Sequence, residues 1–193
     1  MNNIGDGAGD LSPEMIKQME RSFKAAEGLA PALSLLRDNF PPKEYYKQLN
    51  VMIDKSQVEM KFNDHIQCGK QECSFCCHDK IMGSHSEMVN IIEIVKEKNI
   101  PINKSVIQTN DNWDKLNFAQ RACPLLVNGK CSIYEDRPMV CRKHNIALGQ
   151  SPEICKEGGE VGTIIMEGND SLAMADIMLD SKIVVLNFML MKV

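Results

Sequence analysis

Apolar residues recur at helical spacing near the start of the chain. The members of this stripe are Met15, Ile16, Met19, Phe23 and Ala26. Spacings of three and four residues are typical of one face of an α-helix. Because Pro13 suits the first position of a helix, we expect one to begin there and to end at Gly28. Pro31 then predicts the start of a second, shorter helix through Leu36.

A second stripe follows the paired prolines Pro41 and Pro42, which favour a break between helices. Its members are Tyr45, Leu49, Met52, Ile53, Ser56 and Met60. We interpret this stripe as core packing rather than as ligands, because it follows one helix face. The pattern predicts a helix that runs toward Phe62 and leads the chain to its first cysteines.

The clearest helix signal follows Gly83. Ser84 and Glu87 have the spacing of a capping box, in which each side chain bonds to a backbone N–H of the other residue. The apolar stripe of this helix consists of Met88, Ile91, Ile92 and Val95. Pro101 marks its end, and residues 101–122 are polar and weakly patterned. We expect them to form a long connection with at most a short strand or helical turn.

Two short apolar runs flank Asn128 and Gly129, and an Asn-Gly pair in this setting is a strong signal for a β-hairpin. Side chains alternate between the two faces of a strand. In a strict two-residue hairpin Leu126 opposes Cys131, and Cys123 and Cys131 then point to opposite faces. Such a pair could not share a metal ion directly.

Two alternatives would let Cys123 and Cys131 bind one metal ion. A three-residue loop would set Val127 opposite Cys131 and bring both thiols to one face. Alternatively Cys123, directly before Pro124, lies outside the ladder. Shared ligation therefore predicts either a bulged turn or a Cys123 that the ladder does not include.

The segment after the hairpin predicts a short helical turn. Pro138 suits its first position, with Arg137 extended before it. Cys141 then lies in the first turn, where the helix dipole and the neighbouring Arg137, Arg142 and Lys143 favour a thiolate. This environment suits a metal ligand.

Charge and composition narrow the classes of partner. A formal net charge of −4 and a pI near 5.6 argue against broad binding to a nucleic-acid backbone. The N-terminus lacks the basic start and apolar core of a secretory signal, and the most apolar stretch, Ile183–Met191, is shorter than the roughly 20 residues of a membrane span. We therefore expect a cytoplasmic protein without a nucleic-acid or membrane partner.

Eight cysteines are the main chemical feature of the chain, and four of them lie between Cys68 and Cys77. Such thiols suit disulfides, metal ligands or a redox pair. Disulfides are rare in a reducing cytosol. Cys73 and Cys76 have C-x-x-C spacing, but the surrounding βαβ pattern of a thiol redox protein is missing. Metal ligation is the favoured interpretation, and thiol redox chemistry is a weaker alternative.

The order of the cysteine motifs supports this interpretation. "CSFCC" is followed by "CPLL", "CSIYEDRP" and "CR", with a last cysteine in "SPEIC". From about Cys68 to Cys155 this set resembles the YkgJ-type cysteine-cluster family, described as zinc- or iron-chelating. The resemblance implies a small metal-chelating domain of the bacterial cytoplasm. Flagellin lysine methylases are similar to this family, so an iron–sulfur-dependent protein methyltransferase is the enzymatic alternative, with unknown catalytic residues.

We expect the cysteines to converge on one metal site whose partner is a zinc ion or an iron–sulfur cluster. The predicted ligands are Cys73, Cys76, Cys77, Cys123, Cys131 and Cys141. Thiolates suit both kinds of site, and their spacing does not separate the two. Cys68, Cys155, His78 and His144 stay open as further ligands, and a protein partner stays open as well.

The expected fold is mainly α (α+β): a small helical domain with a short β-hairpin, organised around the cysteine cluster. The C-terminal part predicts a helix capped by Asp170 or Ser171, then a strand or buried helix over "KIVVLNFML". We expect four segments. They are a disordered lead (1–11), a helical N-terminal extension (12–66), the metal-chelating domain (67–160) and a C-terminal element packing on that domain (161–193).

Overall fold

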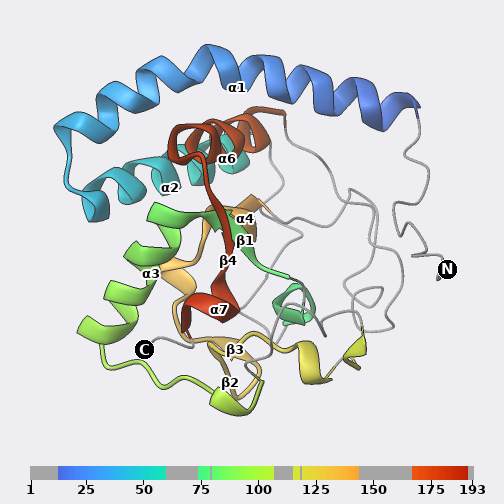
Figure 1. Ribbon diagram of the computed structural model, residues 1–193, viewed down its shortest axis with the longest axis vertical. Helices are drawn as coiled ribbons and strands as arrows, with labels where there is room; N and C mark the ends of the chain where they lie inside the picture. Colours follow the sequence, from blue (N-terminus) through green and yellow to red (C-terminus); the bar gives the residue numbers. More distant parts are fainter. Residues whose placement is uncertain are drawn as a thin grey trace, which may run out of the picture.

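The computed structural model describes residues 13–59, 74–78, 80–106, 115–117, 119–143 and 167–190 (Figure 1). Its elements, in chain order, are α1 (Pro13–Asn39), α2 (Pro42–Glu59), η1 (Phe75–His78), β1 (Met82–Ser84), α3 (His85–Glu97), η2 (Lys104–Val106), η4 (Ala119–Arg121), β2 (Leu126–Val127), β3 (Lys130–Cys131), η5 (Tyr134–Asp136), α4 (Met139–Lys143), α6 (Glu167–Asp180), β4 (Ile183–Val185) and α7 (Leu186–Leu190). Helices dominate, and the strands form two short antiparallel pairs. The predicted mainly α class is confirmed.

The first helix is longer than the sequence predicted. α1 continues through Gly28 and Pro31 to Asn39, so the expected break between two helices is wrong. A proline inside a helix removes one backbone hydrogen bond and crowds the preceding turn. The helix continues because it packs along α6, with Ala26 and Leu33 buried on either side of the two helix breakers. Burial of this face outweighs the local preference of the two residues.

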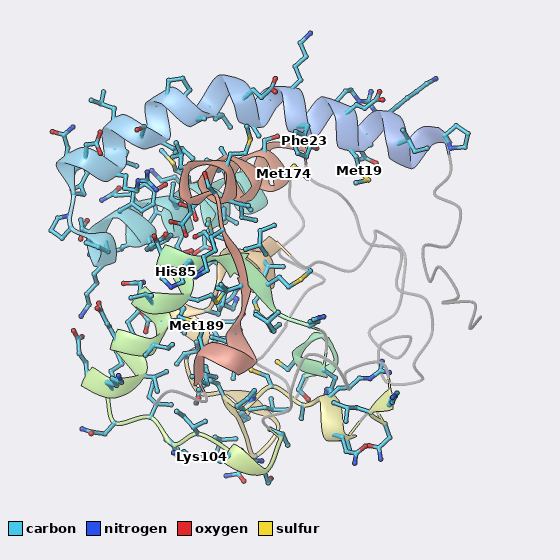
Figure 2. All side chains as sticks on the ribbon, in the orientation of Figure 1. Met19, Phe23, His85, Lys104, Met174 and Met189 are labelled. Atoms are coloured by element: carbon cyan, nitrogen blue, oxygen red, sulfur yellow. The ribbon has the colours of Figure 1, made fainter. Side chains whose placement is uncertain are left out.

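The apolar stripe predicted for the first half of α1 is only partly buried. Ala26 is fully buried, but the side chains of Ile16, Met19 and Phe23 are 44%, 41% and 52% exposed. Figure 2 labels Met19 and Phe23 on α1, and Met174 on α6, the helix packed beneath it. The side chain of Met15 lies outside the described part, as do residues 1–12.

Helices α1, α2 and α6 enclose one apolar cluster, here called the helical core. Its members are Ala26, Leu33, Tyr45, Tyr46, Leu49, Ile53, Met139, Ala173 and Ala175. The α2 stripe is confirmed at Tyr45, Leu49 and Ile53, which are fully buried, whereas Met52 is 47% exposed. α2 ends at Glu59. The remaining stripe positions, the side chain of Ser56 and all of Met60, lie outside the described part, as does Phe62.

Helix α3 begins as predicted, with Ser84 as its cap. The Ser84 Oγ accepts a hydrogen bond from the backbone N–H of Glu87 at 3.1 Å, and the predicted stripe is buried. The Glu87 carboxyl does not complete the capping box. Its Oε1 instead accepts the backbone N–H of Met139, in α4, at 2.7 Å. This half of the prediction is wrong because a buried N–H of another helix takes the acceptor that the box would use.

The C-terminal segment contains both elements that the sequence left open. β4 pairs antiparallel with β1, with Ser84 opposite Ile183, and α7 follows directly. The helix before it, α6, starts at Glu167, so the predicted caps Asp170 and Ser171 lie inside it. The Ser171 hydroxyl donates to the Ser22 carbonyl of α1 at 3.1 Å. Ser171 therefore bonds to α1 from within α6 instead of capping its own helix, which the sequence did not indicate.

The hairpin β2–β3 is strict, with Leu126 opposite Cys131 and Val127 opposite Lys130. Its two loop residues, Asn128 and Gly129, have φ angles of 51° and 75°. Positive φ at both positions is the geometry that an Asn-Gly hairpin turn requires. The three-residue loop is therefore wrong, and the strict register is confirmed.

A second apolar cluster, here called the cysteine-side core, lies below the helical core in Figure 1. Its members are Ile81, Met88, Ile91, Ile92, Val95, Cys123, Leu125, Ile133, Leu186 and Leu190. Met189 of α7, labelled in Figure 2, packs against it. In the described parts of residues 101–122 the expected connection carries short 3₁₀ turns, among them η2 and η4. Within the described part of the chain, no helix has the length and apolarity needed to cross a membrane.

Candidate metal centre

Four of the six predicted ligands have described side chains, and each comes from a different short segment. Cys77 lies in η1, Cys123 between η4 and β2, Cys131 at the end of β3, and Cys141 in α4. Cys123 is buried and the other three are half-buried. No disulfide joins these four cysteines to one another.

The other candidates cannot be placed with these four. Cys73 lies outside the described residues, and so does the side chain of Cys76. The same holds for Cys68, Cys155 and His144, which the sequence left open.

A backbone hydrogen bond ties the first cysteine segment to the second. The N–H of Cys123 donates to the carbonyl of Cys77 at 2.6 Å, and the N–H of Cys77 donates to the carbonyl of Ser74 at 2.9 Å. The 3₁₀ turn and the entry to the hairpin are therefore held side by side, although 45 positions of sequence separate the two cysteines. This contact brings the segments of Cys77 and Cys123 together.

Cys123 lies outside the hairpin ladder. The ladder includes only the pairs Leu126–Cys131 and Val127–Lys130, and the Cys123 carbonyl accepts the N–H of Leu126 at 2.9 Å in a tight turn. Of the two alternatives that would let Cys123 and Cys131 share a metal ion, this is the second. Because Cys123 precedes Pro124 in a turn, the strict alternation of the strand does not govern its direction.

Cys141 lies in the first turn of α4, as predicted. Its N–H donates to the carbonyl of Pro138 at 2.9 Å, and Arg137 before it is extended, with ψ of 150°. The helix begins at Met139, one residue later than expected.

The two arginines near Cys141 in the sequence have partners in other parts of the fold. Arg142 donates to Asp54 at 2.8 Å and to the carbonyls of Arg137 and Glu135. Arg137 stacks on the ring of Tyr134, 3.9 Å from its centroid. The side chain of Lys143 lies outside the described part. Both guanidinium groups are thus committed to partners of their own, which the sequence could not indicate.

All four described cysteines contact the same apolar cluster. Cys123 belongs to the cysteine-side core, and Cys77, Cys131 and Cys141 pack against it. Thiols beside an apolar core are the donors that zinc and iron–sulfur sites use, so this donor set fits either group. Among the described residues, no three His, Cys, Asp or Glu side chains lie close enough to hold a metal ion. The described residues include neither Cys73 nor the Cys76 thiol.

The histidines near the cluster have structural contacts. The Nδ1 of half-buried His78 lies 3.2 Å from the carbonyl of Ser74 and donates to it in the tautomer that carries the proton there. His85, the first residue of α3, is half-buried, and its backbone N–H donates to the carbonyl of Lys182 at 3.0 Å.

Sequence reasoning missed a buried polar network that joins α2, α3 and α6. The hydroxyls of Tyr45 and Ser84 donate to the two carboxylate oxygens of Asp176 at 2.9 and 2.6 Å, and the Tyr46 hydroxyl lies 3.3 Å from Ser84 Oγ. Burial raises the pKa of Asp176 and of both tyrosines. The sequence placed Tyr45 in a helix stripe and Ser84 at a helix cap. It gave no sign that both would bond to Asp176, which lies far along the chain.

Glu87 links this network to α4, because its backbone N–H bonds to Ser84 and its carboxyl accepts the Met139 N–H. Its side chain is 4% exposed, and burial raises the pKa of its carboxyl to about 8, against the opposing effect of the Met139 N–H bond. The side chains of Glu87 and Met88 pack closely against the backbone of Gly83, where an added Cβ would lie 2.5 Å from both Glu87 Oε2 and Met88 Cε. The bond to Met139 holds the start of α4, the helix that carries Cys141.

The comparison with protein families bears directly on these cysteines. Residues 67–156 match the family CxxCxxCC, described as a "putative zinc- or iron-chelating domain". No curated protein and no solved structure matches the chain significantly. The matched segment contains all eight cysteines, including the four that contact the cysteine-side core. The cysteine-rich part of the chain, residues 67–156, is therefore similar to the CxxCxxCC family, as its ordered motifs predicted.

Proposed function

We propose that the protein holds one metal centre, a zinc ion or an iron–sulfur cluster, through cysteine thiolates. The proposed ligands are drawn from Cys73, Cys76, Cys77, Cys123, Cys131 and Cys141. The observation that carries the proposal is the shared contact of Cys77, Cys123, Cys131 and Cys141 with one apolar cluster. These residues come from four segments that only tertiary folding brings to the same core.

The metal would supply cross-links that these segments lack. The hairpin strands have two residues each, η1 has four and α4 has five. Elements this short add little stability of their own, since a helix or hairpin needs more length or packing to persist in water. A structural metal bound by cysteines contributes on the order of 10 kcal/mol to folding. Stabilisation of this region is therefore the first role of the proposed centre.

The proposal includes the setting that suits such a site. Thiolate ligands persist where the medium is reducing, so we place the protein in the bacterial cytoplasm. The metal-chelating unit is proposed to extend over residues 67–160, with residues 12–66 as a helical extension and residues 161–193 packing on it. Its partner is the metal ion.

The test starts from full-length protein purified without oxygen. An absorption spectrum is combined with elemental analysis for zinc, iron and acid-labile sulfide. Colourless protein with one zinc per chain would assign a zinc site, and brown protein with iron and sulfide an iron–sulfur cluster. Protein with neither metal, or with zinc and iron far below one per chain, would overturn the proposal.

Variants then test the ligand set. Cys131→Ser and Cys141→Ser are each expected to lose stoichiometric metal, because each removes one thiolate. His85→Ala is the matched control, since His85 starts α3 and its described contact is a backbone bond. Metal retained at full occupancy in both cysteine variants would remove the proposed site.

A further inference from the structure

Helix α4 carries Cys141, and side-chain contacts with two other helices hold it on either side of that cysteine. In Figure 1 it lies beside β1 and below α6. It has only five residues, so its place in the fold depends on contacts with longer elements. Two such contacts flank the proposed ligand Cys141 in the sequence, one at Met139 and one at Arg142.

The first contact comes from α3. The Glu87 Oε1 atom accepts the backbone N–H of Met139 at 2.7 Å. Glu87 and Met139 are 4% and 2% exposed, so the bond is shielded from water. The first backbone N–H groups of a helix have no acceptor within the helix itself. Without the Glu87 carboxyl a buried N–H at the start of α4 would lose its acceptor, which costs free energy.

The second contact comes from α2. The side chain of Arg142, 4% exposed, donates through Nη1 to Asp54 Oδ2 at 2.8 Å. Its Nε donates to the Arg137 carbonyl at 3.2 Å, and its Nη2 donates to the Glu135 carbonyl. One guanidinium group thus joins α4 both to α2 and to the turn that precedes α4. Because Asp54 is about half exposed, water screens this contact more than the Glu87 bond.

Both contacts act within one helical turn of Cys141. Met139 comes shortly before it, and Arg142 follows it directly. The N–H of Cys141 bonds to the Pro138 carbonyl at 2.9 Å, which closes this turn. Cys141 also packs against the cysteine-side core, as the other three described cysteines do. A shift of α4 would therefore change the distances between the Cys141 thiol and the other thiols.

We propose that Glu87 is a positioning residue of the metal centre: through the Met139 N–H it sets where the Cys141 thiol meets the metal, and the Asp54–Arg142 pair supports it from α2. Because the ligands themselves are proposed, this inference rests on the proposed function. Metal sites depend on groups outside the ligand set that orient the ligands, and loss of such a group lowers metal affinity roughly 10- to 100-fold. Glu87 acts through the backbone of α4 rather than on the thiol itself.

The experiment measures how firmly the full-length protein retains its metal. Parent and variants are purified without oxygen and loaded with the metal or cluster found in the parent, and EDTA is then added stepwise at neutral pH. The readout is the EDTA concentration that removes half of the bound metal, measured by elemental analysis of the protein after gel filtration. Circular dichroism checks that each variant is folded.

Three variants change the two contacts. Glu87→Ala removes the acceptor of the Met139 N–H, whereas Glu87→Gln keeps a side-chain carbonyl oxygen that can accept it. Asp54→Ala removes the carboxylate partner of Arg142.

Two further variants are controls. Glu93→Ala is matched for residue type, because Glu93 is exposed on the same helix as Glu87. Leu33→Ala is the control for stability. It leaves a cavity at a buried position of α1 that takes part in neither contact with α4, so it lowers the overall stability alone.

Glu87→Ala is expected to lose half of its metal at an EDTA concentration at least about tenfold lower than the parent, and Glu87→Gln to stay within about twofold of the parent. Asp54→Ala is expected to show a smaller decrease of about two- to fivefold, as a partly exposed ion pair implies. Glu93→Ala and Leu33→Ala are expected to retain metal as the parent does, although Leu33→Ala unfolds at a lower temperature.

Three results would overturn the positioning role. One is metal retention in Glu87→Ala that equals that of the parent. Another is equal weakening in Glu87→Ala and Glu87→Gln, which would show that the bond to Met139 is not the cause. The third is equal weakening in Leu33→Ala, which would show that metal retention follows overall stability.

Two further outcomes are decided separately. If Glu87→Ala does not fold, Asp54→Ala takes its place, and retention equal to that of the parent in Asp54→Ala then rejects the placement of Cys141 by these contacts. A parent protein that binds no metal would overturn the proposed function and this inference with it. A metal-loaded parent with unchanged variants would overturn the positioning role alone.

Discussion

The helical core and the cysteine-side core are built in different ways. The helical core lies between long elements, since α1 has 27 residues, α2 has 18 and α6 has 14. The cysteine-side core has one long helix, α3, and is otherwise enclosed by elements of two to five residues. The first core supplies its own polar links through Asp176, whereas the second gathers thiols. Long helices stabilise one region, and we expect metal cross-links to stabilise the other.

Helix α4 joins the two regions. Met139 at its start is buried in the helical core, and Cys141, two residues later, packs against the cysteine-side core. The Glu87 carboxyl holds Met139 from α3. We therefore expect a substitution of Glu87 to affect both the helical core and the cysteine-side core.

The largest expected effect comes from removing the metal. Chelation should raise amide hydrogen exchange strongly in residues 119–143 while α1, α2 and α6 stay protected. The reason is that a structural metal contributes on the order of 10 kcal/mol, and the hairpin and α4 are too short to replace it. Exchange measured by mass spectrometry on metal-loaded and metal-free protein checks this. Equal loss of protection in both cores would show that they form one cooperative unit.

The next effect is the pH dependence of folding stability that the Glu87 carboxyl causes. Its carboxyl has a pKa of about 8 in the folded protein and near 4.5 when exposed, so the folded state holds the proton more tightly. The stabilising contribution of this group is fully present below about pH 4.5 and is lost as pH rises through about 8. Glu87→Gln keeps a neutral acceptor for Met139 and should not lose stability in this way.

Urea unfolding of both proteins from pH 4 to 9 measures this difference. The Glu87→Gln variant should match the parent at low pH and exceed its free energy of unfolding by a few kcal/mol at high pH. Comparing the two at each pH cancels the titration of groups that do not interact with Glu87. A difference that does not change with pH would contradict a raised pKa at Glu87.

A smaller loss is expected from Gly83→Ala, at the boundary of the two cores. The new Cβ would lie 2.5 Å from Glu87 Oε2 and Met88 Cε, so both side chains must shift. Overpacking of this kind costs about 1–3 kcal/mol. Thermal unfolding of metal-saturated protein measures it. A variant as stable as the parent would mean that Met88 and Glu87 move without cost.

The smallest effect has the opposite sign. Gly28→Ala lies in the middle of α1, where an added Cβ meets nothing within 4 Å. Replacing a glycine inside a helix by alanine stabilises by roughly 0.5–1 kcal/mol. The same unfolding assay therefore separates a glycine required by close packing, Gly83, from one that is only tolerated. A loss of stability in Gly28→Ala would argue against a continuous α1.

Features that near neighbours decide could be predicted from the sequence, whereas features that distant contacts decide could not. The Ser84 cap and the Asn128-Gly129 turn were predicted correctly, because a residue and its near neighbours decide them. The break at Gly28 and Pro31 was predicted wrongly, because burial against α6 decides it. The identity of the ligands stays a prediction, since Cys73 and the Cys76 thiol lie outside the described residues.

The sequence alone indicated the class of chemistry: cysteines in an ordered pattern predict soft-metal ligation, because thiolates are the donors that zinc and iron–sulfur sites use. It also predicted the hairpin turn, since an Asn-Gly pair readily accepts positive φ at both positions, whereas the strict register was decided by the fold. The tertiary structure decided that Cys123 lies outside the ladder, where its N–H bonds to the Cys77 carbonyl. It also decided that the Glu87 carboxyl accepts the Met139 N–H of α4 rather than completing the capping box of α3, because a buried backbone N–H needs an acceptor.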